Sequence, residues 1–270
     1  MQFEGFSEQF QQATRLINEI RFEYEFIPYS GDNGFGINQL GIRGSVAFPL
    51  FNLETPFLVT PGFAVSFWQG PIQPDTDLPP SVFDGYLEAS WKPKLAPWLS
   101  ADLAASVGAY STFDQVTEKS IRFPAHGYAV LALTDRFDVK VGVEYLDRNR
   151  VKILPAGGII FRPNADVVFE ILFPNPKISR RVTNIGNTEW WMYVRGDYGG
   201  GAWAVTRLSG SYESIDYNDI RILFGLDWRN PGTLDGFFEI GIATDREIVY
   251  KTSPIFRPTT AFLLRAGLIY

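Results

Sequence analysis

The sequence predicts an all-β protein, a single antiparallel transmembrane β-barrel, on three observations. Apolar and polar residues alternate along most of the chain, many alternating segments are about ten residues long, and aromatic residues make up 16% of the 270 residues. Segments of this length match the roughly 9–11 residues of a tilted membrane-spanning strand, whereas strands of soluble proteins average about 5–6. Aromatic residues are typical of strands and of the girdles at the edges of membrane barrels.

The alternation is clearest in four segments: 20–26, 40–48, 137–145 and 220–228. In the first of them, apolar or aromatic residues occupy every second position, and arginine and glutamate lie between them. A strand places these two sets on opposite faces. We therefore expect a wall whose apolar face contacts lipid and whose charged face points inward.

Turn-forming residues divide the chain into fourteen expected strands, an even number as in single-chain bacterial barrels. Twelve strands is the alternative, because segment 202–209 is the weakest of the set. Short turns are expected at the periplasmic end, including one at Gly199–Gly201, and longer loops at the other end, including 174–187. Both termini would be periplasmic. The expected strands span 18–28, 38–49, 57–68, 81–92, 98–110, 122–134, 137–147, 151–162, 165–173, 188–198, 202–209, 218–229, 235–246 and 259–270.

Residues 1–17 are expected to form a short amphipathic helix, and residues 18–270 the barrel. Phe3, Phe6 and Phe10 recur at spacings of three and four, as on one helix face. This helix would cover the periplasmic mouth, plug the lumen, or dock another membrane or periplasmic protein. The sequence does not begin with a basic segment followed by an apolar one, as a signal peptide does. We therefore expect a processed or engineered N-terminus, with a cytosolic protein as the alternative.

The composition excludes several classes of function. The chain has no cysteine, which removes disulfides, thiolate zinc sites and cysteine nucleophiles. It has 24 basic and 30 acidic residues without a basic block, so we expect no nucleic-acid partner. We predict no cofactor and no metal site. Glu213, Asp216 and Asp219 form an oxygen-rich cluster, which we interpret as a solvated acidic loop.

The last expected strand ends on alternating apolar residues and an aromatic. Phe262, Leu264, Leu268 and Tyr270 share one face of this strand. The pattern resembles the C-terminal signal by which the barrel-assembly machinery recognises outer-membrane proteins. The resemblance implies that machinery as a partner, the bacterial outer membrane as the location, and outer-membrane lipid as the surroundings.

Six further motifs lie in the second half of the chain: Leu154–Gly158, Phe161–Asn164, Phe173–Ile178, Gly196–Trp203, Asp216–Arg221 and Asp245–Glu247. They resemble an uncharacterised family of predicted bacterial outer-membrane β-barrel proteins, a domain of unknown function. The likeness extends over most of the chain from about Leu40. It implies a barrel and brings no particular activity with it.

The inward face of the expected barrel carries acidic and basic residues in near balance. Charges are costly in hydrocarbon, so these residues face water or one another. They line a narrow aqueous channel, or they cross-link into salt bridges that fill the lumen, and barrel shear decides between the two. The predicted lumen-lining residues are Glu23, Arg43, Glu88, Arg122, His126, Lys140, Glu144, Glu170, Arg195, Asp197, Arg221, Asp227, Glu239 and Arg265.

Three functions follow as hypotheses. The preferred one is a passive or weakly selective channel for small polar solutes. The alternative is a structural or partner-binding barrel with an occluded lumen. An outer-membrane enzyme is the third, with His126 as its only natural base near neutral pH. We interpret His126 as a polar residue of the wall and predict no catalytic residues.

Overall fold

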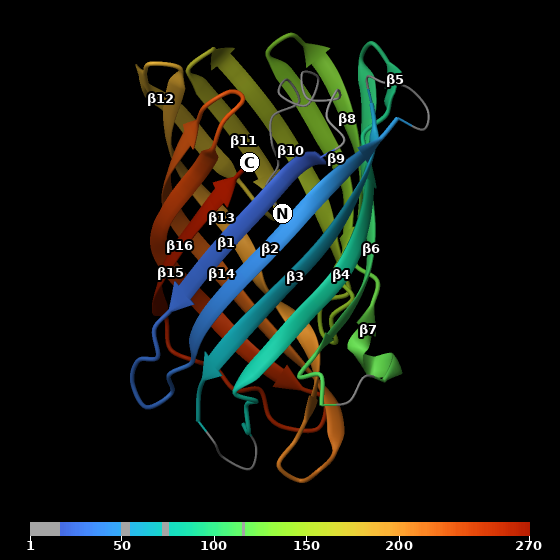
Figure 1. Ribbon diagram of the computed structural model, residues 1–270, viewed down its shortest axis with the longest axis vertical. Coiled ribbons are helices and arrows are strands. Elements are labelled where there is room, and N and C mark those ends of the chain that lie inside the picture. The colour runs from blue at the N-terminus through green and yellow to red at the C-terminus, as the bar shows by residue number, and fades with distance from the viewer. Residues whose placement is uncertain (1–16, 50–54, 72–75, 115–116) are drawn as a thin grey trace.

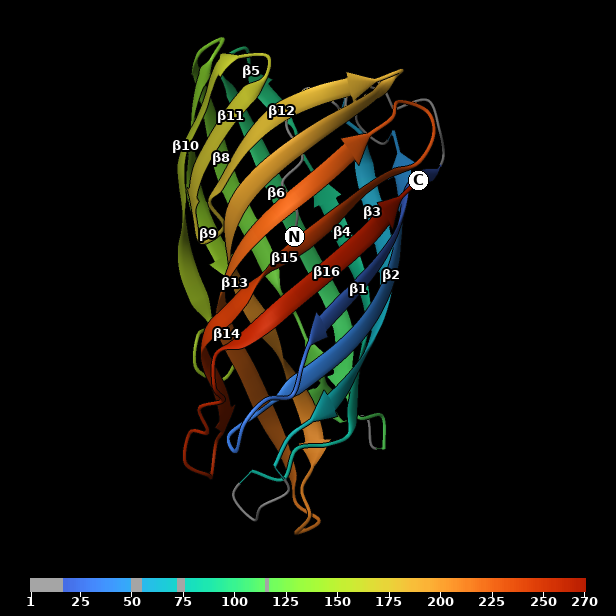
Figure 2. The same cartoon turned by 90° about the vertical axis from the view of Figure 1, so that its left-hand side faces the viewer.

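The strands pair in chain order around a closed ring (Figure 1, Figure 2). The computed structural model describes residues 17–49, 55–71, 76–114 and 117–270. Within these ranges every wall strand is antiparallel to its neighbours, and the ring closes because the first strand pairs with the last. Fourteen strands form the wall, which confirms the expected fold class and the preferred strand number.

The wall strands are long and tilted, as closure of a sheet into a barrel requires (Figure 2). Two short strands, β5 (Lys94–Ala96) and β7 (Ile121–Arg122), pair with β6 outside the ring, and a 3₁₀ helix covers Glu118–Ser120. The wall strands are β1 (Ile17–Ile27), β2 (Gly36–Phe48), β3 (Phe57–Gln69), β4 (Ser81–Trp91), β6 (Leu99–Ser111), β8 (Ala125–Thr134), β9 (Phe137–Tyr145), β10 (Ile153–Asn164), β11 (Val167–Phe173), β12 (Lys177–Ile185), β13 (Thr188–Thr206), β14 (Tyr212–Arg229), β15 (Asp235–Tyr250) and β16 (Ala261–Ile269).

The two ends of the barrel differ. Two-residue turns join β8 to β9, β10 to β11 and β12 to β13 at the end where β1 begins and β16 ends. At that end Ile20 and Tyr270 exchange two backbone hydrogen bonds of 2.8 Å. We call this the turn end, and the opposite one the loop end. The longer connections of the loop end are residues 28–35, 70–80, 112–124, 146–152 and 251–260.

The region from 174 to 209 differs from the sequence prediction. Residues 177–185, expected within a loop, form β12, and Gly199–Gly201, expected as a turn, lie inside the continuous strand β13. The expected strand 202–209 is therefore mostly the end of β13. The prediction omitted β12 and counted 202–209 as a separate strand. These two errors cancel, so the predicted number of strands is right although the strand assignment in this region was wrong.

Physical reasons explain both errors. The alternation in β12 is broken by a register shift between Arg181 and Thr183. The glycine run Gly199–Gly201 is typical of a turn, but here it lies inside a strand, where neighbouring atoms leave no room for larger residues. A Cβ at Gly199 would lie 2.1 Å from the Asp219 carboxylate, and one at Gly200 would lie 1.9 Å from the Tyr217 carbonyl oxygen.

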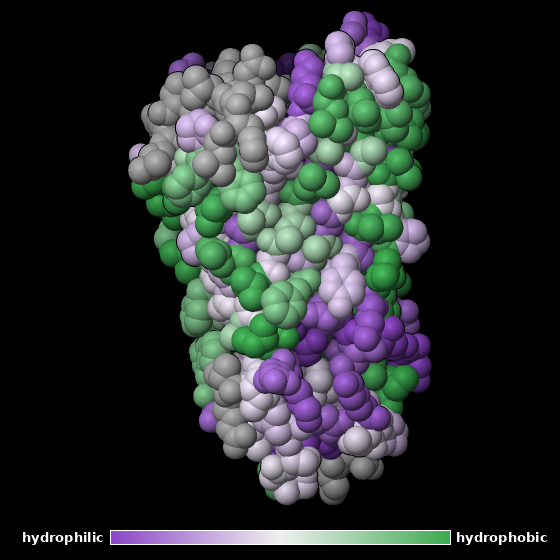
Figure 3. Space-filling view, turned by 90° about the vertical axis from the view of Figure 1, so that its right-hand side faces the viewer, coloured by the Kyte–Doolittle hydropathy of each residue, from purple (hydrophilic) through white to green (hydrophobic). Residues whose placement is uncertain are grey.

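The outer surface of the wall is apolar. In β14, Ile220, Ile222 and Phe224 are exposed, whereas the intervening Arg221 and Leu223 are buried inside the barrel. Figure 3 shows apolar side chains spread over the upper part of one face and hydrophilic ones gathered lower down, toward the loop end. Soluble proteins bury such apolar rows and expose charged residues, whereas this barrel exposes apolar residues outside and buries charged ones inside.

The expected N-terminal helix lies outside the described residues except for Ile17, which begins β1. Among the residues that are described, no helix is long and apolar enough to cross a membrane.

Candidate functional site in the barrel interior

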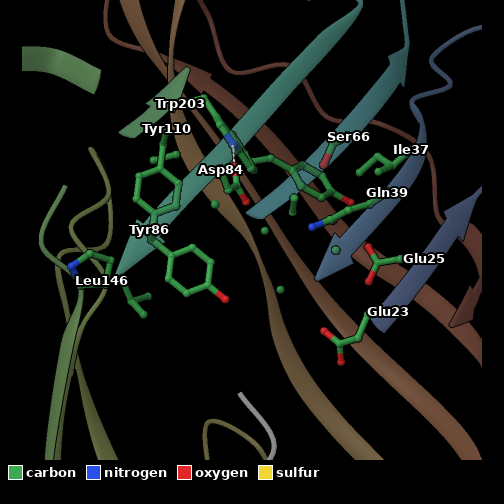
Figure 4. Close-up of a pocket in the computed structure, with 18 of the residues that line it drawn as sticks. Glu23, Glu25, Ile37, Gln39, Ser66, Asp84, Tyr86, Tyr110, Leu146 and Trp203 are labelled. Atoms are coloured by element: carbon green, nitrogen blue, oxygen red, sulfur yellow. Dashed lines mark hydrogen bonds between the residues drawn. The ribbon is translucent and has the colours of Figure 1, made fainter. Parts of the chain in front are cut away.

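A cavity of about 420 Å³ lies inside the barrel. It is enclosed by β1, β2, β3 and β4 on one side and by β13 and β14 on the other, and its lining is shown in Figure 4. Asp84, Tyr86 and Tyr110 lie on one side of this view, and Glu23 and Glu25 on the other. Seven of the expected lumen residues line the cavity: Glu23, Arg43, Arg122, Glu144, Asp197, Arg221 and Arg265.

Four further charged residues line the cavity and were not among the predicted lumen-lining residues: Arg21, Glu25, Asp84 and Arg148. Arg21 and Glu25 share the inward face of β1 with Glu23, so the period-two pattern was sufficient to find them. Asp84 is likewise two residues from Tyr86. Arg148 lies in the loop 146–152, where no periodicity exists to place it.

One ion-pair network braces the wall from β13 to β1. Its centre is Glu239 on β15, which is fully buried and accepts hydrogen bonds of 2.7 Å from Tyr193 Oη, Arg195 Nε and Arg265 Nε. Arg265 also lies 3.6 Å from Asp197. The charges of Glu239 and Asp197 are thus balanced by the guanidinium groups of Arg195 and Arg265.

The same network continues through Arg221 on β14. Its Nη1 donates to Glu25 at 2.6 Å, and its Nε donates to Asp219 at 2.9 Å. On β1, Arg21 donates to Glu23 at 2.8 Å. The pair of Arg221 and Glu25 cross-links β14 and β1, which are not adjacent in the ring.

A second network lies on the opposite wall, across β6, β8 and β9. Lys140 Nζ donates to Asp102 at 2.8 Å, and His126 Nε2 lies 3.4 Å from the same carboxylate. Tyr128 donates its hydroxyl hydrogen to Glu144. His126 therefore lies in an ion-pair network of the wall, beside a buried lysine.

The remaining expected lumen residues lie on the same inner faces. Lys177 on β12 donates to Asp227 at 3.1 Å and is directly opposite Glu170 in the register of β11 and β12. Glu88 follows Asp84 and Tyr86 on the inner face of β4, and within the described residues it has no ion pair.

The hairpin of β13 and β14 leaves the wall near the loop end and crosses the lumen. Along β14 the burial alternates from Ile220 onward, as in a wall, but residues 213–219 are buried on both faces. A bulge in β15 between the partners of Asn218 and Ile220 marks the place where the hairpin departs. We call residues 199–219 the crossing hairpin.

Each face of the crossing hairpin packs on a different part of the barrel. Trp203, Ile215 and Tyr217 join the buried apolar cluster around Phe35 and Trp68. The other face meets the loop 146–152 and β7. There Asn149 donates to Asp216 at 2.8 Å, and Arg122 donates to Ser214 at 2.5 Å.

The crossing hairpin reaches the far wall. Trp203 donates its indole N–H to Asp84 on β4, and its ring meets the Trp68 ring edge-on with centroids 5.1 Å apart. Strand β4 lies seven strands from β13 in either direction around the ring, so this contact spans the barrel. Ala204 also pairs with Ser111 on β6. The loop end is thus narrowed by contacts between opposite walls.

Arg148 satisfies the open edge of β13. The pairing of β13 with β12 ends at Arg195, so the Gly199 and Gly200 carbonyls have no partner on β12. Arg148 donates to the carbonyl oxygens of Gly199 and Gly200 at 2.9 Å each and to Asn218 at 2.8 Å. Its guanidinium thus replaces a strand as the hydrogen-bond partner of this edge.

The acidic cluster is not a solvated loop, so that interpretation was wrong. Glu213, Asp216 and Asp219 are buried in β14. They accept hydrogen bonds from Arg207, Asn149 and Arg221 respectively, because the hairpin folds into the barrel. Across the described ranges, no group of three or more acidic or histidine side chains is placed to hold a metal ion.

The residues of the expected assembly signal lie on the outer face at one edge of the closing seam. Phe262 and Leu268 are exposed, Leu264 is half-buried, and Tyr270 follows the last wall strand. Strand β16 pairs with β1 on this seam, from Arg21 with Ile269 to Phe26 with Leu264.

No family model and no curated protein matches the chain. Among solved structures it is similar to the KdgM porin, with 12% identity over 93% of this chain and 98% of that chain and a TM-score of 0.42. It is also similar to the β domain of the Bordetella autotransporter Brka, with 10% identity and a TM-score of 0.42, and to the NanC porin, with 10% identity and a TM-score of 0.40. Both matches cover 93% of this chain and 97% of the other chain. Similarity at this level does not indicate a function. Membership of the uncharacterised barrel family stays a prediction.

Proposed function

We propose that this protein is a passive, weakly selective channel for small polar solutes in the bacterial outer membrane. The observation that carries the proposal is the polar cavity inside a closed barrel. The lining of this cavity interleaves five acids with six bases: Glu23, Glu25, Asp84, Glu144 and Asp197 against Arg21, Arg43, Arg122, Arg148, Arg221 and Arg265. Interleaved charges largely cancel beyond a Debye length of about 8 Å, so strong ion selectivity is not expected.

The membrane location is supported by the two faces of the wall. Phe22, Leu40 and Val141 are exposed on the outside, whereas Arg195, Arg221 and Glu239 are buried within. In water the exposed rows would form an apolar surface far larger than soluble monomers carry. In a bilayer they contact lipid, and closure of the ring gives every wall strand a partner on both sides. The bacterial outer membrane accommodates such barrels, with its lipid as the immediate partner.

The contacts of the crossing hairpin favour a second candidate, a structural or partner-binding barrel with an occluded lumen. Trp203 bridges opposite walls at the loop end, and a barrel with this contact permanently in place would not conduct. In that case the N-terminal segment 1–17 is the part of the chain that we propose to dock a membrane or periplasmic protein.

Single-channel recording in planar bilayers distinguishes the two candidates. The purified full chain is expected to produce discrete current steps in potassium chloride, because the charged cavity admits hydrated ions. A heat-modifiable gel shift of the same sample verifies that the barrel is folded. A folded full chain that gives no current, while the protein with the crossing hairpin shortened conducts, would favour the occluded barrel.

The C-terminal strand is proposed to be recognised by the barrel-assembly machinery. Replacing Tyr270 by aspartate is expected to reduce the amount of folded barrel in membranes severalfold, because a charge would then end the apolar outer row of β16. The matched control is Tyr29→Asp, in the exposed loop after β1. Quantitative immunoblots of outer-membrane fractions measure both variants, and equal losses would count against this role of β16.

A further inference from the structure

Three inward-facing aromatic rings of the wall share one arrangement. Each ring lies against a glycine of the neighbouring strand, where an added Cβ atom would clash with it, and a basic side chain of the protein lies over each ring. The distances from the ammonium nitrogens to the first two ring centroids are 3.9 and 3.8 Å, and that from the guanidinium carbon to the third is 5.1 Å. The rings are Tyr128 with Gly142 and Lys140, Tyr193 with Gly225 and Lys177, and Phe237 with Gly267 and Arg21.

Tyr86 is a fourth ring of this kind, but its face is not covered. A Cβ at Gly62 would lie 2.2 Å from Tyr86 Cζ, so the ring packs directly against β3. Tyr86 lines the cavity, and in the part of the chain that the structure describes no lysine or arginine lies over its ring. The position that a basic side chain takes in the other three cases is open to the cavity here.

The charges around Tyr86 favour a cation at that position. Asp84 and Glu88 flank Tyr86 on the inner face of β4, and neither forms an ion pair within the described ranges. The basic group that acts on Tyr86 is Arg43, which is shared with Glu19 at 3.6 Å. Arg21, the next base, is held by Glu23 at 2.7 Å. The two bases nearest the ring thus each have a carboxylate of their own, whereas Asp84 and Glu88 have no basic partner within the described ranges.

We propose that the cavity wall formed by Asp84, Tyr86, Tyr110 and Trp203 binds a small organic cation with an ammonium head (Figure 4). The head lies over the Tyr86 ring, as the lysine ammoniums lie over Tyr128 and Tyr193, and the Asp84 carboxylate balances its charge. Alkylated ammonium is more weakly hydrated than an alkali ion, so less hydration is lost when it contacts a ring face. The inference rests on the proposed channel function for access of the ligand to the cavity, and it names the class of solute.

Titration with choline tests the proposal, with dimethylbutanol as the uncharged isostere of the same shape. Binding to the full chain in detergent micelles is measured by saturation-transfer NMR of the methyl groups. Saturable binding of choline and at least about tenfold weaker binding of the isostere are expected, because the attraction to the ring requires the charge. Tyr86→Leu and Asp84→Asn should each weaken choline binding about tenfold.

The control variant is Tyr24→Leu, which removes a tyrosine from the exposed outer face and should leave choline binding unchanged. Equal binding of choline and its isostere, or unchanged binding by folded Tyr86→Leu protein, would overturn the proposal. The heat-modifiable gel shift shows which variants are folded, and Tyr86→Phe retains the ring for the case in which leucine disturbs β4. Conductance in potassium chloride without choline binding would refute this site alone. Choline binding without conductance would refute the channel and leave the site.

Discussion

Replacing Glu239 by alanine is expected to lower the free energy of unfolding by about 3–5 kcal/mol. Glu239 is fully buried, and its two oxygens accept hydrogen bonds from Tyr193, Arg195 and Arg265. Without it, two guanidinium groups remain inside the wall with less negative charge to balance them. Losing one partner of a buried pair is costly for this reason, even where the intact pair adds little to stability.

Urea unfolding of the reconstituted protein, followed by tryptophan fluorescence, measures this effect. The control is Asp166→Ala, because the Asp166 side chain is 56% exposed and pairs with Arg181 at the turn end. A surface pair of this kind contributes at most about 1 kcal/mol. Glu239→Gln keeps the shape and loses the charge, so it should fall between the two. A Glu239→Ala protein as stable as Asp166→Ala would show that the network does not brace the wall.

Shortening the crossing hairpin is expected to increase the single-channel conductance severalfold, because pore conductance grows with the cross-section of its narrowest part. The variant deletes residues 202–216 and joins Gly201 to Tyr217 through an Asn-Gly turn, since these two residues are directly paired. It removes Trp203, whose contacts with Asp84 and Trp68 span the barrel. The wall pairs of β13 and β14 from Glu189 to Gly201 remain.

A disulfide provides the complementary experiment with the hairpin intact. Ala204 and Ser111 are bridge partners between β13 and β6, and the natural chain has no cysteine. The pair Ala204→Cys and Ser111→Cys should therefore form one defined disulfide that fixes the hairpin across the lumen. Conductance is expected to rise when a reductant is added to this variant and to stay constant in the natural chain. A shortened hairpin with unchanged conductance would show that the hairpin does not limit the current.

The wall strands could be predicted from the sequence because the alternation that defines them involves only neighbouring residues. Side chains alternate between outside and inside along a strand that has lipid on one side and charged neighbours on the other, and β1, β2, β9 and β14 from Ile220 onward show this directly. The prediction was wrong where this condition ends. Residues 213–219 are buried on both faces, and the glycine run before them looks like a turn because its function is close packing.

The interior could be predicted only in part. The period-two pattern placed Glu23, Arg221 and Glu239 on inner faces, but the pairing among them depends on which strands meet across the lumen. Trp203 reaches Asp84 over a sequence distance of 119 residues, and no local pattern reports such a contact. Arg148 was missed for the same reason, since its partners Gly199 and Asn218 lie on a distant hairpin.

The reversal potential of the full chain in a potassium chloride gradient tests the central claim most directly. We expect discrete current steps and a permeability ratio of potassium to chloride close to unity, because acids and bases are interleaved around the cavity. Strong selectivity for either ion would contradict the mixed lining. The absence of current from the folded full chain would contradict the channel itself.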